Sequence, residues 1–124
     1  MDVYDGPATI AEAYATPKGA SPEQAALCQD LRELFSKMGV GSPGYPAFRV
    51  GDAFSYDAAN PVHSTLVLFY EGSDIQHLFA YEYASLDSYQ GMEVMNDFLS
   101  DRGWYHEQFN SVCGAFYRTN GGKR

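Results

Sequence analysis

The sequence is short of basic residues, and none occurs between Arg49 and Arg102. The whole chain holds 8 Lys and Arg against 16 Asp and Glu, which gives a formal net charge of -8 and an isoelectric point near 4.6. Direct binding to DNA or RNA needs a basic surface, because counterion release at the phosphates supplies most of the non-specific affinity. We therefore expect no direct contact with nucleic acid.

Cysteine is also scarce, since the chain has only Cys28 and Cys113. Two cysteines are too few for a disulfide scaffold, and these two lack the spacing of a redox or zinc pair. We interpret both as buried small hydrophobic residues.

Long apolar runs are absent, and none approaches the roughly 20 residues that a membrane span needs. The first ten residues, MDVYDGPATI, are acidic, where a secretory signal peptide is basic and then continuously apolar. We therefore expect a cytoplasmic protein with no membrane partner.

Motifs for metal, nucleotide or cofactor binding are absent as well. The chain has no HExxH, CxxC, EF-hand, Walker A or GxGxxG pattern, so we expect neither a metal nor a cofactor. The histidines do not form a catalytic set: His63 is expected to face Glu82 as a surface charge pair, and His77 to lie opposite Leu68 in the core. His106 has no indicated nucleophile beside it. We predict that the protein is not an enzyme.

What is present is the composition of a globular protein, with 45% hydrophobic and 19% charged residues. A chain of 124 residues is one domain that buries roughly two-thirds of its unfolded surface. The pattern predicts an α+β fold in which two or three helices pack on one face of a small antiparallel sheet of about four strands, in the order ααβββαβ.

Helical patterns occur in three segments. A short helix is predicted over residues 7–14, where alanine is frequent. The second helix has Ser21 as its N-cap, Pro22 at the first helical position and Gln24 as the partner in a capping box, and it ends at Gly39. The third is predicted over residues 86–101, where apolar residues recur every three or four positions.

Strand patterns occupy most of the rest of the chain. Two longer strands are predicted as a hairpin that turns at Gly72 and Ser73. The predicted strands are 47–50, 53–56, 62–70, 75–83 and 112–118, with 104–109 as either a strand or an ordered loop.

Acidic residues are concentrated where basic ones are absent. Nine of them lie between Val50 and Asp101, and an ordinary acidic surface would intersperse both signs of charge. On the third predicted helix Glu93, Asp97 and Asp101 are four residues apart, so they form a row on its solvent face, away from the apolar stripe. Like charges at this spacing are destabilising, and the helix dipole also disfavours anions near the C-terminus.

The row has a spacing that suggests a function. Four helical residues rise about 6 Å, which is comparable with the separation of neighbouring phosphates along one nucleic-acid strand. We hypothesise that the protein is a small inhibitor that binds a basic nucleic-acid-handling protein, such as a nuclease or a CRISPR or restriction component. It would block the DNA- or RNA-binding surface by phosphate mimicry. Acidic inhibitors of this class occur among phage and plasmid proteins and among immunity proteins that neutralise nuclease toxins.

Affinity in such an interface comes from aromatic anchors beside the charges. The chain is 15% aromatic, with several aromatic residues in loops or at element ends. The expected partner-binding residues are Glu82, Asp87, Glu93, Asp97, Asp101, Tyr45, Tyr56, Trp104 and Tyr105.

Other interpretations stay open at this point. A solvated acidic surface without a partner is one. A small-molecule-binding or enzymatic domain is another, with an aromatic pocket under the loop over residues 39–61. A homodimer through a sheet edge is plausible as well.

Overall fold

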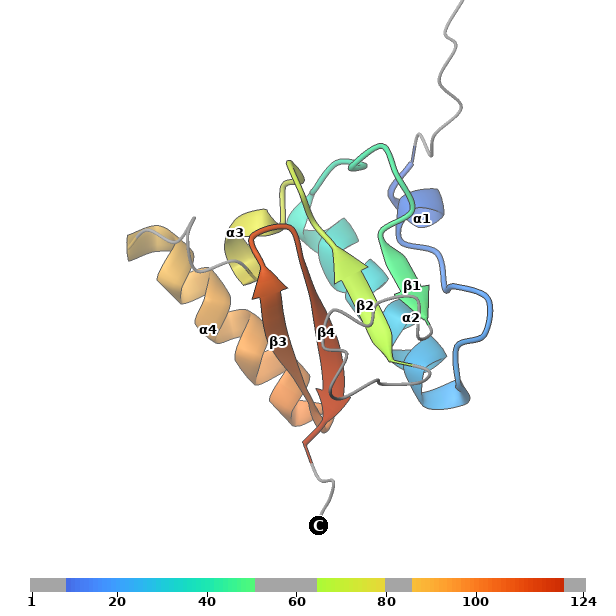
Figure 1. Cartoon of the computed structure of the whole chain (residues 1–124). Coiled ribbons are helices and arrows are strands. Elements are labelled where there is room, and N and C mark those ends of the chain that lie inside the picture. Colours follow the sequence, from blue (N-terminus) through green and yellow to red (C-terminus); the bar gives the residue numbers. More distant parts are fainter. Residues whose placement is uncertain (1–8, 51–64, 80–85, 120–124) are drawn as a thin grey trace, which may run out of the picture.

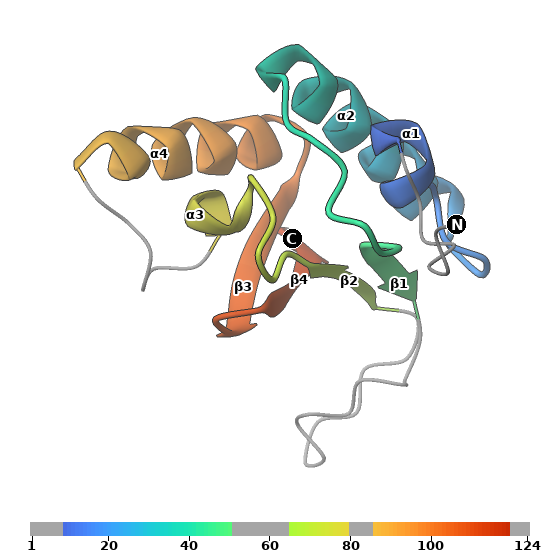
Figure 2. The same cartoon turned by 90° about the horizontal axis from the view of Figure 1, so that it is seen from above.

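Four helices lie on one side of a four-stranded antiparallel sheet (Figures 1 and 2). The computed structural model describes residues 9–50, 65–79 and 86–119, with backbone alone for residues 86–90. The strand order across the sheet is β1-β2-β4-β3. The predicted small α+β fold, with its helices on one face, is confirmed. The elements are α1 (Ile10–Ala13), α2 (Pro22–Met38), β1 (Phe48–Val50), β2 (Leu66–Phe69), α3 (Gln76–Phe79), α4 (Leu86–Asp101), β3 (Trp104–Asn110) and β4 (Cys113–Arg118).

Helix α2 begins and ends where its sequence signals predict. Ser21 and Gln24 form the reciprocal capping box, with the Ser21 hydroxyl accepting from the Gln24 N–H at 3.1 Å and the Gln24 side chain accepting from the Ser21 N–H at 2.9 Å. Gly39 ends the helix in the left-handed conformation, with φ at 75°, which only glycine adopts without strain. Helix α1 is shorter than predicted, because Thr9 caps it in a second capping box.

Helix α4 has the predicted bounds, Leu86–Asp101. Met92, Met95 and Leu99 are buried against the rest of the protein, as the three- and four-residue spacing predicts. A Cβ added to Gly91 would lie 2.8 Å from the Leu78 side chain, so α4 passes close over α3. Glycine at this position permits the close approach.

The predicted strand over residues 75–83 is wrong in its described part, which forms α3. Ser73 begins this turn: its hydroxyl accepts from the Ile75 N–H at 3.3 Å, and its carbonyl accepts from the Gln76 N–H at 3.2 Å. Both edges of β2 are already paired, one with β1 and the other with β4, so no edge is left for the predicted hairpin. Apolar residues over 75–79 fit both an alternating and a helical spacing, and so short a run does not separate the two. The element order is therefore ααββααββ.

The other predicted strands agree with the sheet wherever the structure describes them. The segment over residues 47–50 contains β1, the segment over 112–118 contains β4, and the segment over 104–109 is a strand, β3. The described part of the 62–70 prediction contains β2. The predicted strand over residues 53–56 lies outside the described residues.

The two faces of the sheet bury different clusters. The face under the helices holds the main core, which includes Phe48, Leu68 and Phe116 together with residues of α2 and α4. On the opposite face Val67, Cys113 and Ala115 form a smaller buried cluster. Successive strand residues point to opposite faces, so the alternation assigns each side chain to one of these clusters.

His106 packs tightly against rings of the main core. Its ring centroid lies 4.7 Å from that of Phe79 and 5.2 Å from that of Phe116, and the imidazole covers Gly114 on the adjacent strand. A Cβ on Gly114 would collide with that ring and would lie 2.6 Å from the backbone oxygen of Glu107. Glycine is therefore required at this position. Without a side chain there, β3 can pair with β4 while the imidazole lies between the strands and the helices.

Candidate functional site

The outer face of α4 carries a row of acids that have no ion-pair partner among the described residues. Glu93, Asp97 and Asp101 are all exposed, and in the described part of the chain none of them forms an ion pair. Their spacing of four residues places them about one turn apart on the same side of the helix. The predicted exposed row is therefore present, and α4 has no basic residue in its last turn to offset it.

Arg102, the first basic residue after the row, is directed elsewhere. Its Nε donates to Asp30 Oδ2 on α2 at 3.0 Å, and its Nη1 donates to the carbonyl oxygen of Phe98 at 3.1 Å. The guanidinium also lies 3.7 Å from the centre of the Phe98 ring. Its charge is thus matched by Asp30 and by the C-terminal carbonyls of α4, and the row is left without a counter-charge from this residue.

Val94 adds an apolar side chain to the same face. It is 62% exposed, and it lies three residues before Asp97 and seven before Asp101, so it neighbours both on the helix surface. Val94 is not among the predicted partner-binding residues, although its place outside the apolar stripe was a signal that it would be exposed.

The three predicted aromatic anchors that the structure describes, Tyr45, Trp104 and Tyr105, do not gather beside the acidic row. Tyr45 is half-buried, and its hydroxyl donates to the carbonyl oxygen of Glu71 at 2.7 Å, while burial and the nearby Glu71 raise the Tyr45 pKa to about 12. Trp104 is only 6% exposed. Tyr105 is 46% exposed and pairs with the Tyr117 ring at 5.6 Å, on the face of the sheet away from the helices. Of the three, Tyr105 alone is exposed, and it lies in a different layer from α4.

The remaining predicted contact residues are outside the description. Glu82 and Tyr56 lie in residues that the structure does not describe, and for Asp87 only the helical backbone in the first turn of α4 is described. The predicted pair of His63 with Glu82 lies outside it for the same reason.

Among the described residues, His106, Cys28 and Cys113 have pKa values that favour their neutral forms. Burial lowers the pKa of His106 to about 3, and its Nε2 atom has no hydrogen-bond partner among the described residues. His77 is half-buried on α3, so the predicted position opposite Leu68 is wrong, because Leu68 pairs with β1 and β4. Cys28 and Cys113 are buried, which raises both thiol pKa values, that of Cys28 to about 12. Both cysteines are therefore buried hydrophobic residues, as predicted.

The described residues also give two results on other kinds of site. Among them, no group of three or more His, Cys, Asp or Glu side chains is arranged to hold a metal ion. No helix in the described ranges combines the length and the apolar character needed to cross a membrane.

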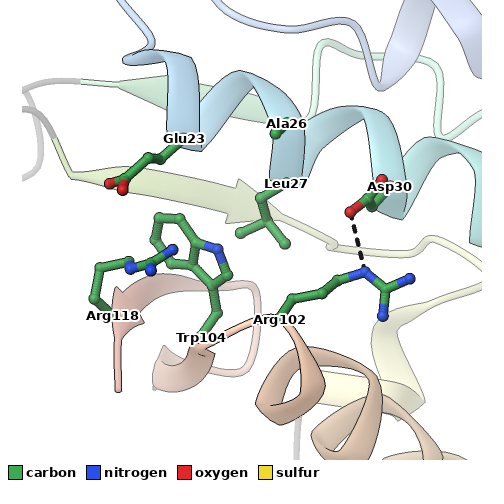
Figure 3. A pocket seen from close by; sticks show the side chains of 7 residues that line it. All are labelled: Glu23, Ala26, Leu27, Asp30, Arg102, Trp104 and Arg118. Carbon is green, nitrogen blue, oxygen red and sulfur yellow. Dashed lines mark hydrogen bonds and ion pairs between the residues drawn. The ribbon is translucent and has the colours of Figure 1, made fainter. Parts of the chain in front are cut away.

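A pocket of about 250 Å³ opens between the first half of α2 and the ends of β3 and β4 (Figure 3). Ala26, Leu27 and Trp104 supply its apolar lining. Its charged lining consists of Glu23 and Asp30 from α2, Arg102 from the turn after α4, and Arg118 from β4. The alternative interpretation of the sequence placed a pocket elsewhere, under residues 39–61. It missed this one because its walls come from segments more than 70 residues apart.

Comparisons with known protein families, with curated proteins and with solved structures gave no match.

Proposed function

We propose that this protein is a non-enzymatic inhibitor whose α4 acidic face, defined as Glu93, Val94, Asp97 and Asp101, binds a basic nucleic-acid-handling protein. The face would occupy the surface that the partner uses for DNA or RNA, with the carboxylates in the place of phosphates. Partners of this kind include nucleases and components of CRISPR or restriction systems, and such an inhibitor acts in the cytoplasm where they operate.

The observation that carries the proposal is the unpaired state of the row. Three exposed carboxylates, one turn apart, cost stability through mutual repulsion and through the helix dipole. Arg102, the base that follows the row in the sequence, is bound to Asp30 instead. A partner with a basic surface would relieve this repulsion when it binds, because it supplies the opposite charge.

Val94 gives the face a place for an apolar contact. Charge complementarity speeds association and selects partners, whereas affinity comes mainly from apolar and aromatic side chains that become desolvated. A side chain that is 62% exposed between two acids would lose water when a basic surface docks on it. We therefore place the centre of the contact at Val94 and Asp97.

The test begins with capture of a partner by the immobilised protein, at low salt and again at about 0.5 M salt, where the Debye length falls to a few Å. The captured protein should be released by the salt, should bind DNA or RNA by itself, and should be displaced from the complex by added nucleic acid. A captured protein that binds this chain and nucleic acid at the same time would contradict blocking by mimicry.

The residue-level test neutralises the row with Glu93→Gln, Asp97→Asn and Asp101→Asn together. A matched control neutralises three exposed acids away from α4, with Glu33→Gln, Glu71→Gln and Glu107→Gln. Both variants change the net charge by the same amount, so only a local role for the row predicts that the first loses capture and the second keeps it. Equal capture by the two variants would refute the α4 acidic face as the binding surface.

A further inference from the structure

We propose that the pocket between α2 and β4 binds a free α-amino acid with an apolar side chain. The inference is independent of the proposed inhibitor function, because no residue of the α4 acidic face lines this pocket. It follows from the distribution of charge and apolar surface within the pocket.

The apolar part of the pocket is a fixed floor. Leu27 is 1% exposed and Trp104 is 6% exposed, and both belong to the main core, so neither can move far without disturbing it. The Trp104 indole faces Leu27 across the opening (Figure 3). Little of their surface is open, so this floor suits a small aliphatic side chain and offers little to a polar one.

One end of the pocket is electrically satisfied. Asp30 and Arg102 form an ion pair at 3.0 Å, and Arg102 is held further by the Phe98 carbonyl and ring. The two charges of this pair neutralise each other, so this end of the pocket needs no charged group on the ligand.

The other end presents two opposite charges that are not joined to each other. Glu23 on α2 and Arg118 on β4 both lie on the side of the Trp104 indole that faces away from Arg102 (Figure 3). No ion pair links either residue to another in the described part of the chain. The Arg118 guanidinium lies 4.9 Å from the centre of the indole, which orients its planar face and leaves its N–H groups to donate to a carboxylate.

An α-amino acid matches this arrangement with few atoms. Its carboxylate would accept from Arg118, its ammonium would donate to Glu23, and its side chain would lie on the floor formed by Ala26, Leu27 and Trp104. The volume of about 250 Å³ is below the roughly 300–1,000 Å³ typical of pockets for drug-sized ligands, which limits the occupant to a single small molecule.

The chain contains one tryptophan, so all tryptophan fluorescence comes from Trp104 in this pocket. The probes are L-leucine, 4-methylpentanoate, which lacks the ammonium, and isoamylamine, which lacks the carboxylate. We expect L-leucine to change the Trp104 emission saturably, with a dissociation constant of about 0.1–1 mM, as suits a ligand of this size. Each of the two partial analogues should bind more weakly than L-leucine.

The two exposed charged side chains can be changed without replacing a residue of the floor. Arg118→Gln should weaken the binding of L-leucine and of 4-methylpentanoate by about tenfold and leave isoamylamine binding unaffected. Glu23→Gln should weaken the binding of L-leucine and of isoamylamine by about tenfold and leave 4-methylpentanoate binding unaffected. Glu33→Gln on the same helix and Arg49→Gln on β1 are the matched controls, and neither should change any of the three affinities. Calorimetric titration repeats the comparison without relying on the indole signal, which Arg118→Gln itself alters.

Three results would overturn the proposal. The first is no saturable response to L-leucine up to about ten times the expected dissociation constant. The second is an unchanged affinity for L-leucine in Arg118→Gln. The third is equal binding of L-leucine and of the peptide glycyl-leucine, whose amide replaces the ammonium, since that would assign the pocket to a peptide carboxyl terminus.

Discussion

Acidification from about pH 7.5 to about pH 5.0 is expected to lower the free energy of unfolding by about 2 kcal/mol through the protonation of His106 alone. Burial among Phe79, Phe116 and neighbouring rings lowers the His106 pKa from 6.5 to about 3 in the native state. Between these two values the unfolded chain binds a proton at His106 and the native protein does not. Stability is therefore full above pH 6.5 and falls as the pH falls, by about 1.4 kcal/mol per pH unit once well below 6.5.

The measurement is urea unfolding followed by Trp104 fluorescence, at several pH values across that range, for wild type and for His106→Leu. Ordinary carboxyl groups titrate near pH 4 and contribute alike to both proteins, so the difference between the two pH dependences isolates His106. His77→Gln is the control, since it removes a different imidazole, on α3, and leaves His106 in place. The reasoning is refuted if wild type and His106→Leu lose the same free energy of unfolding between about pH 7.5 and pH 5.0.

Three further predictions concern stability and are read by the same unfolding assay. Gly114→Ala should destabilise the fold by about 2 kcal/mol or more, because its Cβ would lie 2.6 Å from the backbone oxygen of Glu107, whereas Gly41→Ala, whose Cβ would meet only a side-chain atom at 3.5 Å, should change little. Ser21→Ala should cost about 1 kcal/mol by removing the cap of α2, and a change within error would contradict the capping role. Asp101→Asn should stabilise the protein by a few tenths of a kcal/mol, since it removes an anion from the C-terminal end of α4; a loss would show that the carboxylate has a structural partner.

Local signals in the sequence were sufficient for the two long helices. Ser21, Gln24 and Gly39 each act within a few residues of the chain, and the apolar spacing over residues 86–101 is longer than any strand would carry. The α4 row followed from the same periodicity, because the apolar stripe and the acids occupy opposite sides of one helix. These features needed no knowledge of the tertiary structure.

Features that depend on distant contacts were not predictable in this way. The segment at residues 75–79 has an ambiguous spacing, and its helical state follows from the pairing of β2 with β1 and β4 on both edges. The ion pair of Arg102 with Asp30 joins residues 72 apart in sequence, and it decides both that the row is unpaired and that the pocket has a closed end. The burial of Trp104 depends on the same junction.

The most direct test of the proposed inhibitor function is the dissociation constant of the complex between this protein and its captured basic partner. It should be measured with the variant that neutralises Glu93, Asp97 and Asp101 and with the control that neutralises three acids outside α4. We predict that the first variant raises the constant at least about tenfold at low salt, and that the control stays within about threefold of wild type. A row variant that binds as tightly as the control, or a complex whose affinity is independent of salt, would contradict binding through the α4 acidic face.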